Sequence, residues 1–550
     1  MRSYLPVVHD SSGTTYRLEG VKEDNLYNCI PWVLNNGEIG ACPRQELTTA
    51  GSSPTPDAIA DRGRGITVFG SVTNIYCDQT HYFYTGGSTD MTDTSSPGYA
   101  GNTGFADEYL SSFVEHKISG VPNLVIVNAG HTSTHASANH GNVWYAADNN
   151  VAPASISDAD MPGNNGVSLC RGGASLDGYF FVGDINGQIH NSNLNDITAW
   201  TATDFITASR NTGLGIYIGR HHDDVISITT KGVEFFYNAG NSSGSPLARR
   251  ADVYYAVGCY YPNAIAQVGD VIYFVGSDNK SGWPHVYKLQ NHQLSIISDG
   301  RIDELLRTLG GNLPYLPALE SMFHAVWLTH STMGDSPGLI LTNAVDSDPD
   351  YNFTYYWHEK ANKWCRWEYG ASVTYFGGGN AGANWTRSLP IVSYNGVEGF
   401  KDNTRALYQL TNSTIVYESI TADNDAMNDM AAANAPTVFM RFPRWDAGTD
   451  KKKRINWIRV VTAPVAKNSV IDPMNVDLKW FDYKTAVASG PLPPDTNYST
   501  ARTVDLNVRG AKIARCGTTR ERDFILDWPL GHGPASVVKG LEIEYDIVGE

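Results

Sequence analysis

Short runs of β-branched and aromatic residues recur along most of the chain, and turn residues separate them at the spacing of β-hairpins. The runs 264–268 and 271–275 flank Gly269 and Asp270, which predicts two antiparallel strands around a two-residue turn. The same reasoning predicts hairpins from 389–392 with 397–400 and from 179–182 with 188–189. Further predicted strands are 124–127, 143–145, 216–218, 225–228, 233–237, 285–289, 324–328 and 364–367. The pattern indicates an all-β protein.

So many short strands cannot form one open sheet without curling, whereas radial blades of about four strands protect their edges by repetition. The sequence therefore predicts a β-propeller over residues 61–420. No WD or kelch signature marks the repeats, so the number of blades stays open. One packing helix is predicted at 299–309, where apolar residues follow a helical period and Gly310-Gly311 supplies a stop.

Different patterns flank the predicted propeller. Residues 1–60 are rich in turn residues and are predicted to form an extended N-terminal arm that embraces a neighbour. Residues 421–436 are polar and rich in Asn and Ala, which indicates a linker or an exposed insertion. Residues 437–550 alternate cleanly between apolar and polar positions, as in 475–480 and 541–548, which predicts a separate C-terminal β-sandwich.

The composition agrees with short aromatic strands and tight turns. Hydrophobic residues make up 41% of the 550 residues, with 53 Gly, 30 Tyr and 13 Trp. The formal charge is -17, from 57 acidic and 40 basic side chains, which argues against a protein that grips nucleic acid. A mildly repulsive wall is compatible with a conduit through which DNA slides.

Seven scattered cysteines without a CxxC pair are predicted to be reduced and mostly buried thiols. The N-terminus reaches Pro6 and charged residues before a signal-peptide core develops, and no apolar run approaches the ~20 residues of a membrane helix. A soluble protein that is made in the cytoplasm and does not insert into a membrane is expected.

The order of several short segments carries a family resemblance. They are Asn28–Pro31, Arg62–Ile66, Ile189–Ser192, Thr198–Phe205, the stretch from Gly213 through Val271–Gly276 to Leu306, and Trp357–Trp364. In this order they resemble the tail hub, or packaged DNA stabilization, proteins of short-tailed bacteriophages (podoviruses). The similarity spans most of the chain at low identity. The chain is longer than that family at 85–170 and 411–435, which leaves its attachment partners open.

The resemblance implies a structural protein of the virion tail, assembled in the host cytoplasm and without enzymatic activity. It implies a ring, hexameric in the family, which docks below the portal and adaptor rings as part of the head–tail connector. Such a ring retains the packaged genome and later conducts the DNA through its lumen without sequence-specific binding. It also holds the tail needle and the tailspike or fibre proteins.

Two groups of residues could bind a metal ion instead of forming ordinary polar loops. Three neighbouring histidines could bind a transition metal if their loop folds back, and three alternate carboxylates resemble a Ca²⁺ loop without the glycine and distal Glu of an EF-hand. The residues are His131, His135 and His140, and Asp346, Asp348 and Asp350. Exposed loops are the preferred interpretation, so no metal, cofactor or catalytic site is predicted.

Three further motifs receive ordinary structural interpretations. Gly240–Gly244 matches the G-x-S-x-G nucleophile elbow but runs into Ser245-Pro246 instead of a helix, so a hairpin tip is predicted. His221–Asp224 is interpreted as a solvated turn between two strands. Lys451–Arg454 is the one strong basic run and could meet DNA phosphate or an acidic neighbouring subunit, or form a solvated hairpin tip.

The sequence therefore favours a ring-forming tail hub or nozzle whose work is mechanical. A glycan-binding or glycan-cleaving propeller that acts on host polysaccharide is the first alternative, since the loops are rich in aromatic and acidic residues. A fibre-like adhesion module is the second. Activity on bacterial polysaccharide would indicate the first alternative, and a trimeric mass would indicate the second.

Overall fold

The computed structural model describes about three fifths of the chain in separate segments. They are residues 1–8, 26–27, 29–34, 36–43, 47–52, 63–69, 72–77, 80–84, 92–93, 111–118, 120–130, 140–146, 153–210, 213–241, 243–259, 261–278, 281–309, 326–333, 336–343, 353–367, 375–376, 390–392, 406–410, 438–443, 445–449, 451–464, 475–482, 501–506, 512–528 and 536–548. Strands dominate these residues, and α1 (Gly300–Leu309) is the one α-helix among them. The all-β prediction is confirmed.

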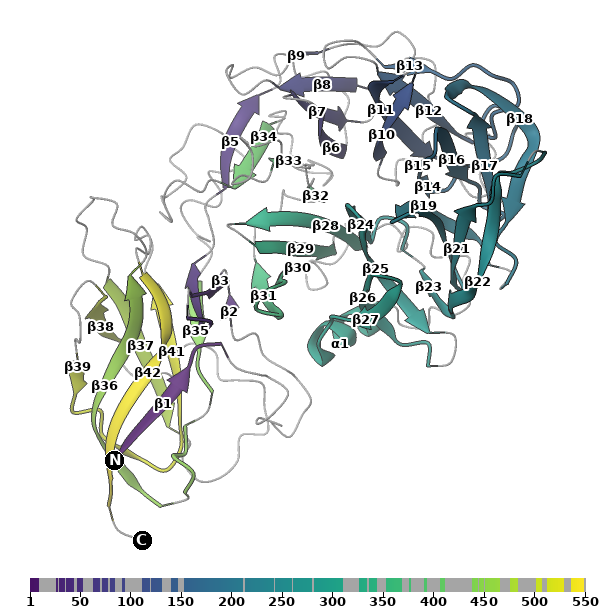
Figure 1. Ribbon diagram of the computed structural model, residues 1–550. Helices are drawn as coiled ribbons and strands as arrows, with labels where there is room; N and C mark the ends of the chain where they lie inside the picture. Colours follow the sequence, from purple (N-terminus) through teal and green to yellow (C-terminus); the bar gives the residue numbers. More distant parts are fainter. Residues whose placement is uncertain are drawn as a thin grey trace.

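Seven groups of consecutive strands lie around a common centre in Figure 1. The first three are β6 (Gly63–Phe69), β7 (Val72–Cys77), β8 (Thr80–Tyr84) and β9 (Thr92–Asp93); β10 (Ser112–Ile118), β11 (Val121–Ala129), β12 (Gly141–Ala146) and β13 (Ala154–Ser155); and β15 (Ala174–Leu176), β16 (Tyr179–Gly183), β17 (Gln188–Asn193) and β18 (Asp196–Thr207). Within each group successive strands pair antiparallel.

The remaining groups continue the same arrangement. The fourth group is β19 (Gly215–His221), β20 (Asp224–Thr229), β21 (Val233–Asn238) and β22 (Leu247–Tyr255), and β14 (Arg171–Gly172) pairs in parallel with β19. The fifth is β23 (Val257–Cys259), β24 (Ile265–Val268), β25 (Val271–Asp278), β26 (Pro284–Gln290) and β27 (Gln293–Ile296), and the sixth is β28 (Val326–Met333), β29 (Ser336–Asn343), β30 (Phe353–His358) and β31 (Lys363–Trp367). The seventh is β32 (Tyr375–Phe376), β33 (Pro390–Val392) and β34 (Ala406–Leu410), with β5 (Leu47–Ser52) as its fourth strand. Repeated sheets of about four strands are the blades of a β-propeller, which confirms that prediction.

The hydrophobic core lies between neighbouring blades. Val127 on β11 belongs to one buried cluster with Phe180 and Val182 on β16. Phe235 on β21 belongs to another with Phe274 on β25. Because each blade buries apolar side chains against the next, the blades stabilise one another rather than folding as independent sheets.

The predicted strand positions agree with the structure wherever both are described. The hairpin predicted at 264–275 is β24 and β25, which turn between Val268 and Val271. The hairpin at 179–189 is β16 and β17. The hairpin predicted from 389–392 with 397–400 is wrong in its pairing, because β33 lies between β32 and β34 and pairs with both. The segment 397–400 itself and the insertion 421–436 lie outside the described residues.

The helix forms where the periodicity predicts it. The Asp299 side chain accepts hydrogen bonds from the backbone N–H groups of Arg301 (2.9 Å) and Ile302 (3.0 Å), which caps the helix N-terminus. Ile302 and Leu306 are fully buried in the cluster that also contains β28–β31 residues. The helix therefore packs between two blades, as expected.

The expectation of an irregular N-terminal arm is wrong for the described part of residues 1–60. These residues form β1 (Arg2–Pro6), β2 (Leu26–Tyr27), β3 (Cys29–Val33), β4 (Ile39–Pro43) and β5. β5 completes the last propeller sheet, whereas β1 and β4 pair with the C-terminal strand β42. The sequence pattern does not predict these strands, because they are short and carry Pro, Gly and polar residues. They form because they pair with strands that are far away in the sequence.

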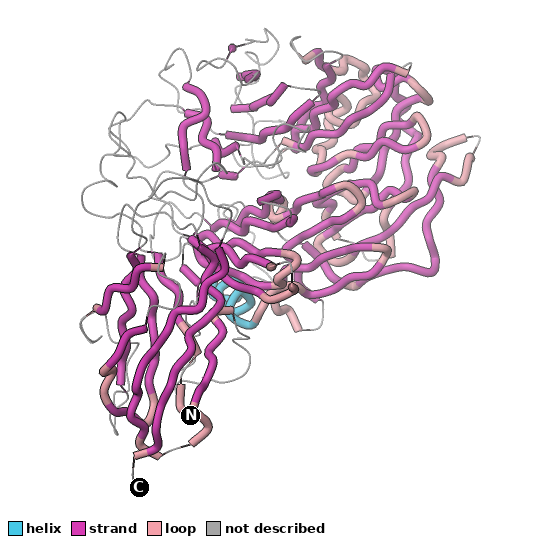
Figure 2. Tube along the Cα trace, turned by 60° about the vertical axis from the view of Figure 1, so that its left-hand side comes forward, coloured by secondary structure: helices cyan, strands magenta, loops and turns pink. Residues whose placement is uncertain are grey.

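The C-terminal strands lie in two sheets that share one hydrophobic cluster. One sheet contains β1, β3, β4, β36 (Lys453–Pro464), β39 (Lys512–Ala514), β40 (Thr518–Thr519) and β42 (Ser536–Ile547). The other contains β2, β35 (Val438–Arg441), β37 (Asn475–Asp482), β38 (Arg502–Asp505) and β41 (Arg522–Trp528). Figure 2 shows these strands as a distinct body beside the propeller. We call this body the C-terminal unit.

The C-terminal unit is joined to the propeller through hydrogen-bonded strands. β2 pairs in parallel with β31 of the propeller and antiparallel with β35, so one sheet runs from β28 to β38. The indole N–H of Trp367 donates to the Cys29 carbonyl at 2.9 Å, and both residues belong to the shared core. The two bodies therefore share one sheet at this junction.

Six of the seven cysteines have described side chains, and each is a buried thiol outside any disulfide, as predicted. Burial raises the pKa of Cys42 and of Cys259 to about 12, so these thiols stay protonated. No helix in the described part of the chain is long and apolar enough to cross a membrane.

Candidate functional site

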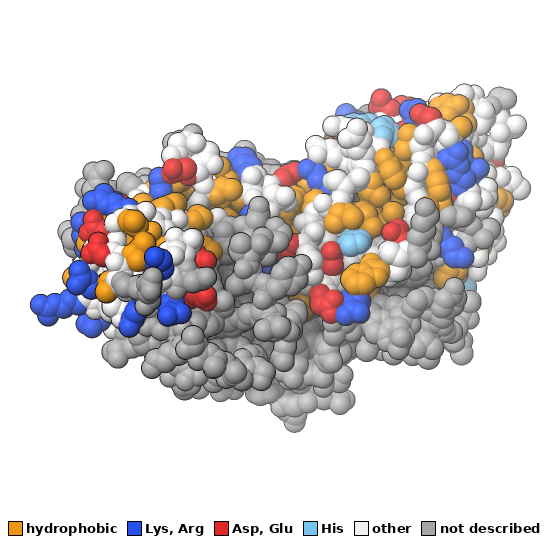
Figure 3. Space-filling model, turned by 90° about the horizontal axis from the view of Figure 1, so that it is seen from below, with side chains coloured by type: hydrophobic (Ala, Val, Ile, Leu, Met, Phe, Trp, Pro, Cys, Tyr) orange, Lys and Arg blue, Asp and Glu red, His pale blue; other side chains and the backbone are white. Residues whose placement is uncertain are grey.

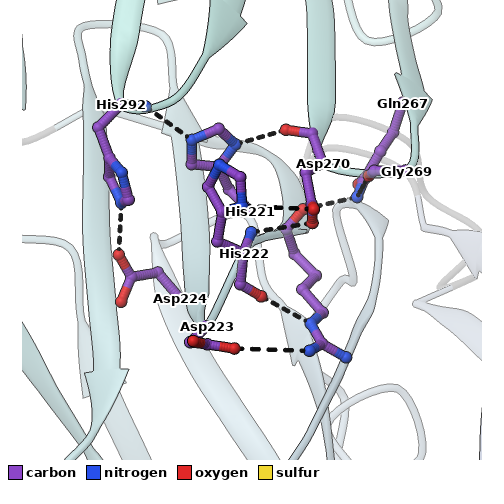
Figure 4. Close-up of polar contacts among 9 residues, drawn as sticks. His221, His222, Asp223, Asp224, Gln267, Gly269, Asp270 and His292 are labelled. Carbon is purple, nitrogen blue, oxygen red and sulfur yellow. Dashed lines mark hydrogen bonds and ion pairs between the residues drawn. The ribbon is translucent and has the colours of Figure 1, made fainter.

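Titratable side chains gather between two neighbouring blades (Figure 4). His221 and Asp224 close the turn between β19 and β20, Asp270 lies in the turn between β24 and β25, and His292 lies in the turn between β26 and β27. With His222 they form what we call the histidine cluster. The ring centroids of His221 lie 4.6 Å from His222 and 4.7 Å from His292.

Tight turns bring these residues together. Gln290 pairs with Gln293 around Asn291 and His292, whose φ angles of 50° and 56° are those of a two-residue hairpin turn. His222 also has a left-handed φ of 55°. Asn and His adopt this conformation more readily than branched residues, because their side chains make local hydrogen bonds.

His221 is fully buried, and both ring nitrogens are hydrogen-bonded. Nδ1 lies 2.6 Å from the Asp270 carbonyl oxygen, and Nε2 accepts the backbone N–H of His292 at 2.9 Å. Since Nε2 accepts, Nδ1 carries the proton and the ring is neutral. Burial lowers the pKa of His221, and the neighbouring His292 and His222 lower it further, against the opposing effect of the Asp270 carbonyl.

Asp224 is the buried anion of the cluster. Its Oδ2 lies 2.6 Å from the Nε of Arg250 and 2.7 Å from the Nε2 of His292, so both groups donate to it. Asp270 binds the same turn from the other blade, since its Oδ1 accepts the His222 backbone N–H at 3.0 Å. Charge-assisted contacts of this kind are stronger than neutral hydrogen bonds and hold the two blades in register.

Neighbouring polar contacts extend this connection. The Gln267 amide donates to the Arg220 carbonyl at 2.6 Å, and Tyr217 donates to the Gln267 side chain at 3.0 Å. Arg220 also donates to the Ser175 carbonyl of the preceding blade at 3.2 Å. Three successive blades are therefore linked by side chains near these turns.

The contacts of the histidine cluster are those of a connection between two blades. Both nitrogens of His221 and the Nε2 of His292 are already engaged by protein groups. In the described ranges no group of three His, Cys, Asp or Glu side chains is arranged to hold a metal ion. What the cluster can do is fix the relative position of two blades and make that position sensitive to protonation.

The interpretation of His221–Asp224 as a solvated turn is wrong for two of its residues. His221 and Asp224 are fully buried, because the hairpin turns of the next blade cover them, whereas the Asp223 side chain is 94% exposed. Sequence reasoning also missed Asp270, His292 and Arg250. The available signal was the Asn291-His292 pair between two strand-like runs. This pair predicts a tight turn, but it does not indicate that the turn packs against His221.

The other sequence candidates do not converge on one site. His140 is half-buried, and its Nδ1 lies 3.1 Å from the Ser168 hydroxyl, whereas His131 and His135 lie outside the described residues. Asp346, Asp348 and Asp350 also lie outside them. Gly240–Gly244 connects β21 to β22, two paired strands, with no helix after it. The elbow geometry of a hydrolase is therefore missing at this turn.

The basic run at Lys451–Arg454 divides into buried and exposed parts. Lys453 is fully buried, its ammonium donates to the carbonyls of Thr449 and Arg520 (2.7 Å for the latter), and it lies 5.8 Å from the Trp445 ring centroid. Lys451 and Lys452 are exposed, as expected of a hairpin tip. The interpretation as a solvated tip, one of the alternatives left open by the sequence, is therefore wrong for Lys453, whose side chain is buried beside Trp445.

The fold defines a β-propeller, and comparison with known proteins adds a likeness to one family over part of the chain. Residues 112–324 match the family model described as "Bacteriophage P22 Gp10, beta-propeller". The resemblance to a phage protein family is thus confirmed for this segment, which begins at β10 and ends just before β28, as a likeness to a phage β-propeller. No curated protein sequence matches the chain.

Similarity to solved structures is distant. The WD40 domain of Neurospora crassa Pan2 is 12% identical with a TM-score of 0.38, and the match covers 67% of this chain and 97% of that domain. An ancestral GH74 enzyme is 11% identical with a TM-score of 0.37, and the match covers 70% of this chain and 51% of the enzyme.

Proposed function

We propose that this chain is a structural tail protein of a short-tailed bacteriophage that forms the hub, or nozzle, of the tail. Several copies form a ring, expected to be a hexamer, below the portal and adaptor rings. The ring retains the packaged genome, conducts it during DNA ejection, and anchors the needle and the tailspikes or fibres. The match of residues 112–324 to the phage propeller family carries this proposal.

The packing described above supports a mechanical role. Blades that share buried clusters and a histidine cluster resist displacement relative to one another. The continuous sheet from β28 to β38 transmits force between propeller and C-terminal unit. A net charge of -17 suits a passage through which a polyanion moves without adhering.

The proposal is tested by the mass of the purified full-length chain in solution, measured by mass photometry over a range of protein concentrations. A closed oligomer, of six copies in the expected case, supports the ring. A monomer at every concentration, or a trimer, contradicts it. Incubation with capsular polysaccharide of the host tests the glycan alternative, since chain shortening would indicate an enzyme.

A further inference from the structure

Charge is distributed unevenly between the two ends of the sequence. Residues 437–550 carry 17 basic and 14 acidic side chains, a net charge of +3, whereas residues 1–436 carry 23 and 43, a net charge of -20. Residues 437–550 form most of the C-terminal unit, and residues 1–436 contain the propeller. Two bodies of opposite charge within one chain attract each other between copies as well as within one.

Four exposed basic side chains lie at one end of the C-terminal unit. Lys451 and Lys452 precede β36, Arg515 lies between β39 and β40, and Arg520 lies between β40 and β41. The pairing of β36 with β39 and β40 places these turns beside one another, since Lys453 pairs with Thr519. We call the four residues the basic end, and Figure 3 shows Lys and Arg side chains gathered over this part of the molecule.

The basic end differs from the rest of its sheet in how its charges are compensated. Arg454 lies 3.4 Å from Asp546, and Arg459 forms an ion pair with Glu542. Arg2 lies 3.5 Å from Glu544. In the described segments no ion pair involves the side chain of Lys451, Lys452, Arg515 or Arg520. These charges remain available for a partner.

A buried lysine holds the turns of the basic end in place. The Lys453 ammonium bonds to the carbonyls of Thr449 and Arg520, one in each turn, so it ties the two turns together. The Val548 N–H donates to the Lys452 carbonyl at 2.8 Å and adds a third strand end. A charged surface that is ordered before binding loses less entropy on association.

We propose that the basic end docks on the acidic propeller of a second copy of this chain. The inference rests on the ring of the proposed function and names the surface that closes it. An acidic protein partner fits better than DNA, because the remaining -20 charges would repel a polyanion that approached the same molecule. Contacts between unlike charges at an interface direct assembly and fix its register.

Charge reversal in pairs tests the inference on the full chain. The variants are Lys451→Glu with Lys452→Glu, and Arg515→Glu with Arg520→Glu. The matched control is Lys117→Glu with Lys231→Glu, two exposed lysines of the propeller. Oligomer dissociation constants are measured by analytical ultracentrifugation at low and high salt, with thermal unfolding as a check that each variant folds.

We expect each basic-end pair to weaken association about tenfold or more at low salt, and less at high salt where charges are screened. The control pair is expected to leave association unchanged. If the wild-type chain forms a ring and both basic-end variants form it equally well, the inference is wrong and the ring stands. If the wild-type chain never associates, both the inference and the proposed ring are wrong.

A fluorescent DNA duplex of random sequence supplies the competing outcome. Tight binding by the wild-type chain that is lost in the basic-end variants, with association unaffected, would assign the surface to DNA and contradict the inference. Absence of such binding, together with weakened association, supports docking between copies. The probe separates the two because phosphate binding and subunit docking are measured on the same variants.

Discussion

At the scale of single residues, the neutral state of His221 is the most informative feature. Its two hydrogen bonds reach the Asp270 carbonyl and the His292 N–H, both in the neighbouring blade. A second proton on Nε2 would turn this nitrogen into a donor, and the His292 N–H would lose its acceptor. The side chain therefore acts as a connector whose geometry depends on one tautomer.

Replacing His221 with Leu should destabilise the propeller by ~2–4 kcal/mol, because the fully buried ring is lost and the part-buried carbonyl of Asp270 and N–H of His292 both lose their partner. Urea unfolding followed by tryptophan fluorescence measures this loss. The control is His222→Asn, because this ring is 38% exposed and Asn tolerates the left-handed φ of 55°, so its replacement should cost under ~1 kcal/mol. Equal losses in the two variants would show that the connection is unimportant.

At the scale of elements, strand β14 shows how closely the blades approach. Gly172 has a φ of +90°, and a Cβ at this position would lie 1.9 Å from the Ile218 carbonyl oxygen of β19. Such a contact is impossible without movement of the backbone, so the parallel pairing of β14 with β19 requires glycine.

Gly172→Ala is expected to lower stability by more than ~2 kcal/mol, through left-handed strain together with the clash. Gly240→Ala is the matched control, since Gly240 also has a positive φ of 66° but nothing within 4 Å of the added atom. Strain alone should cost it about 1 kcal/mol. Differential scanning calorimetry of both variants measures the difference, and equal melting temperatures would contradict the close approach.

Strand β1 and the residue that follows it contribute to the C-terminal unit through Leu5 and Val7, which are buried in its core. Val7→Asp should therefore loosen this unit by at least ~3 kcal/mol, because an unpaired carboxylate would enter an apolar cluster. Hydrogen exchange at β42 reports the loss. Arg2→Ser, which removes two ion pairs of an exposed side chain and its contact with the Trp457 ring, should change exchange little. Unchanged exchange in Val7→Asp would show that β1 is not docked.

The sequence predicted local structure better than long-range pairing. Hairpins such as β24–β25 and the helix α1 were predicted correctly, because their signals lie within a few neighbouring residues. The strands at the N-terminus were missed, since β1 and β5 pair with residues hundreds of positions away. The histidine cluster was missed for the same reason: His221 and His292 meet only when two blades pack.

At the scale of the whole molecule, buried histidines make stability depend on pH. Burial lowers the pKa of His116 and His221, and lowers the pKa of His330 and His358 to about 4. Below pH ~6.5 the unfolded chain takes up protons at these rings while the folded chain does not. The contribution of these neutral rings to the free energy of unfolding is therefore complete above pH ~6.5 and decreases progressively toward pH ~4.

The melting temperature should accordingly fall as the pH is lowered from ~7.5 to ~5. For His358 alone, whose ring is nearly buried, the loss at pH ~4 amounts to about 3 kcal/mol. Differential scanning fluorimetry across this range measures the trend. A melting temperature that rises on acidification would show that relief of repulsion among the 57 acidic residues dominates instead.

The central claim is that copies of this propeller close into a ring that surrounds a passage. Cryo-electron microscopy of the purified full-length chain, assembled at low salt, tests this claim most directly. The account predicts a closed ring of identical subunits, six in the expected case, with an open channel along its axis. Isolated monomers, or a compact trimer without a channel, would contradict it.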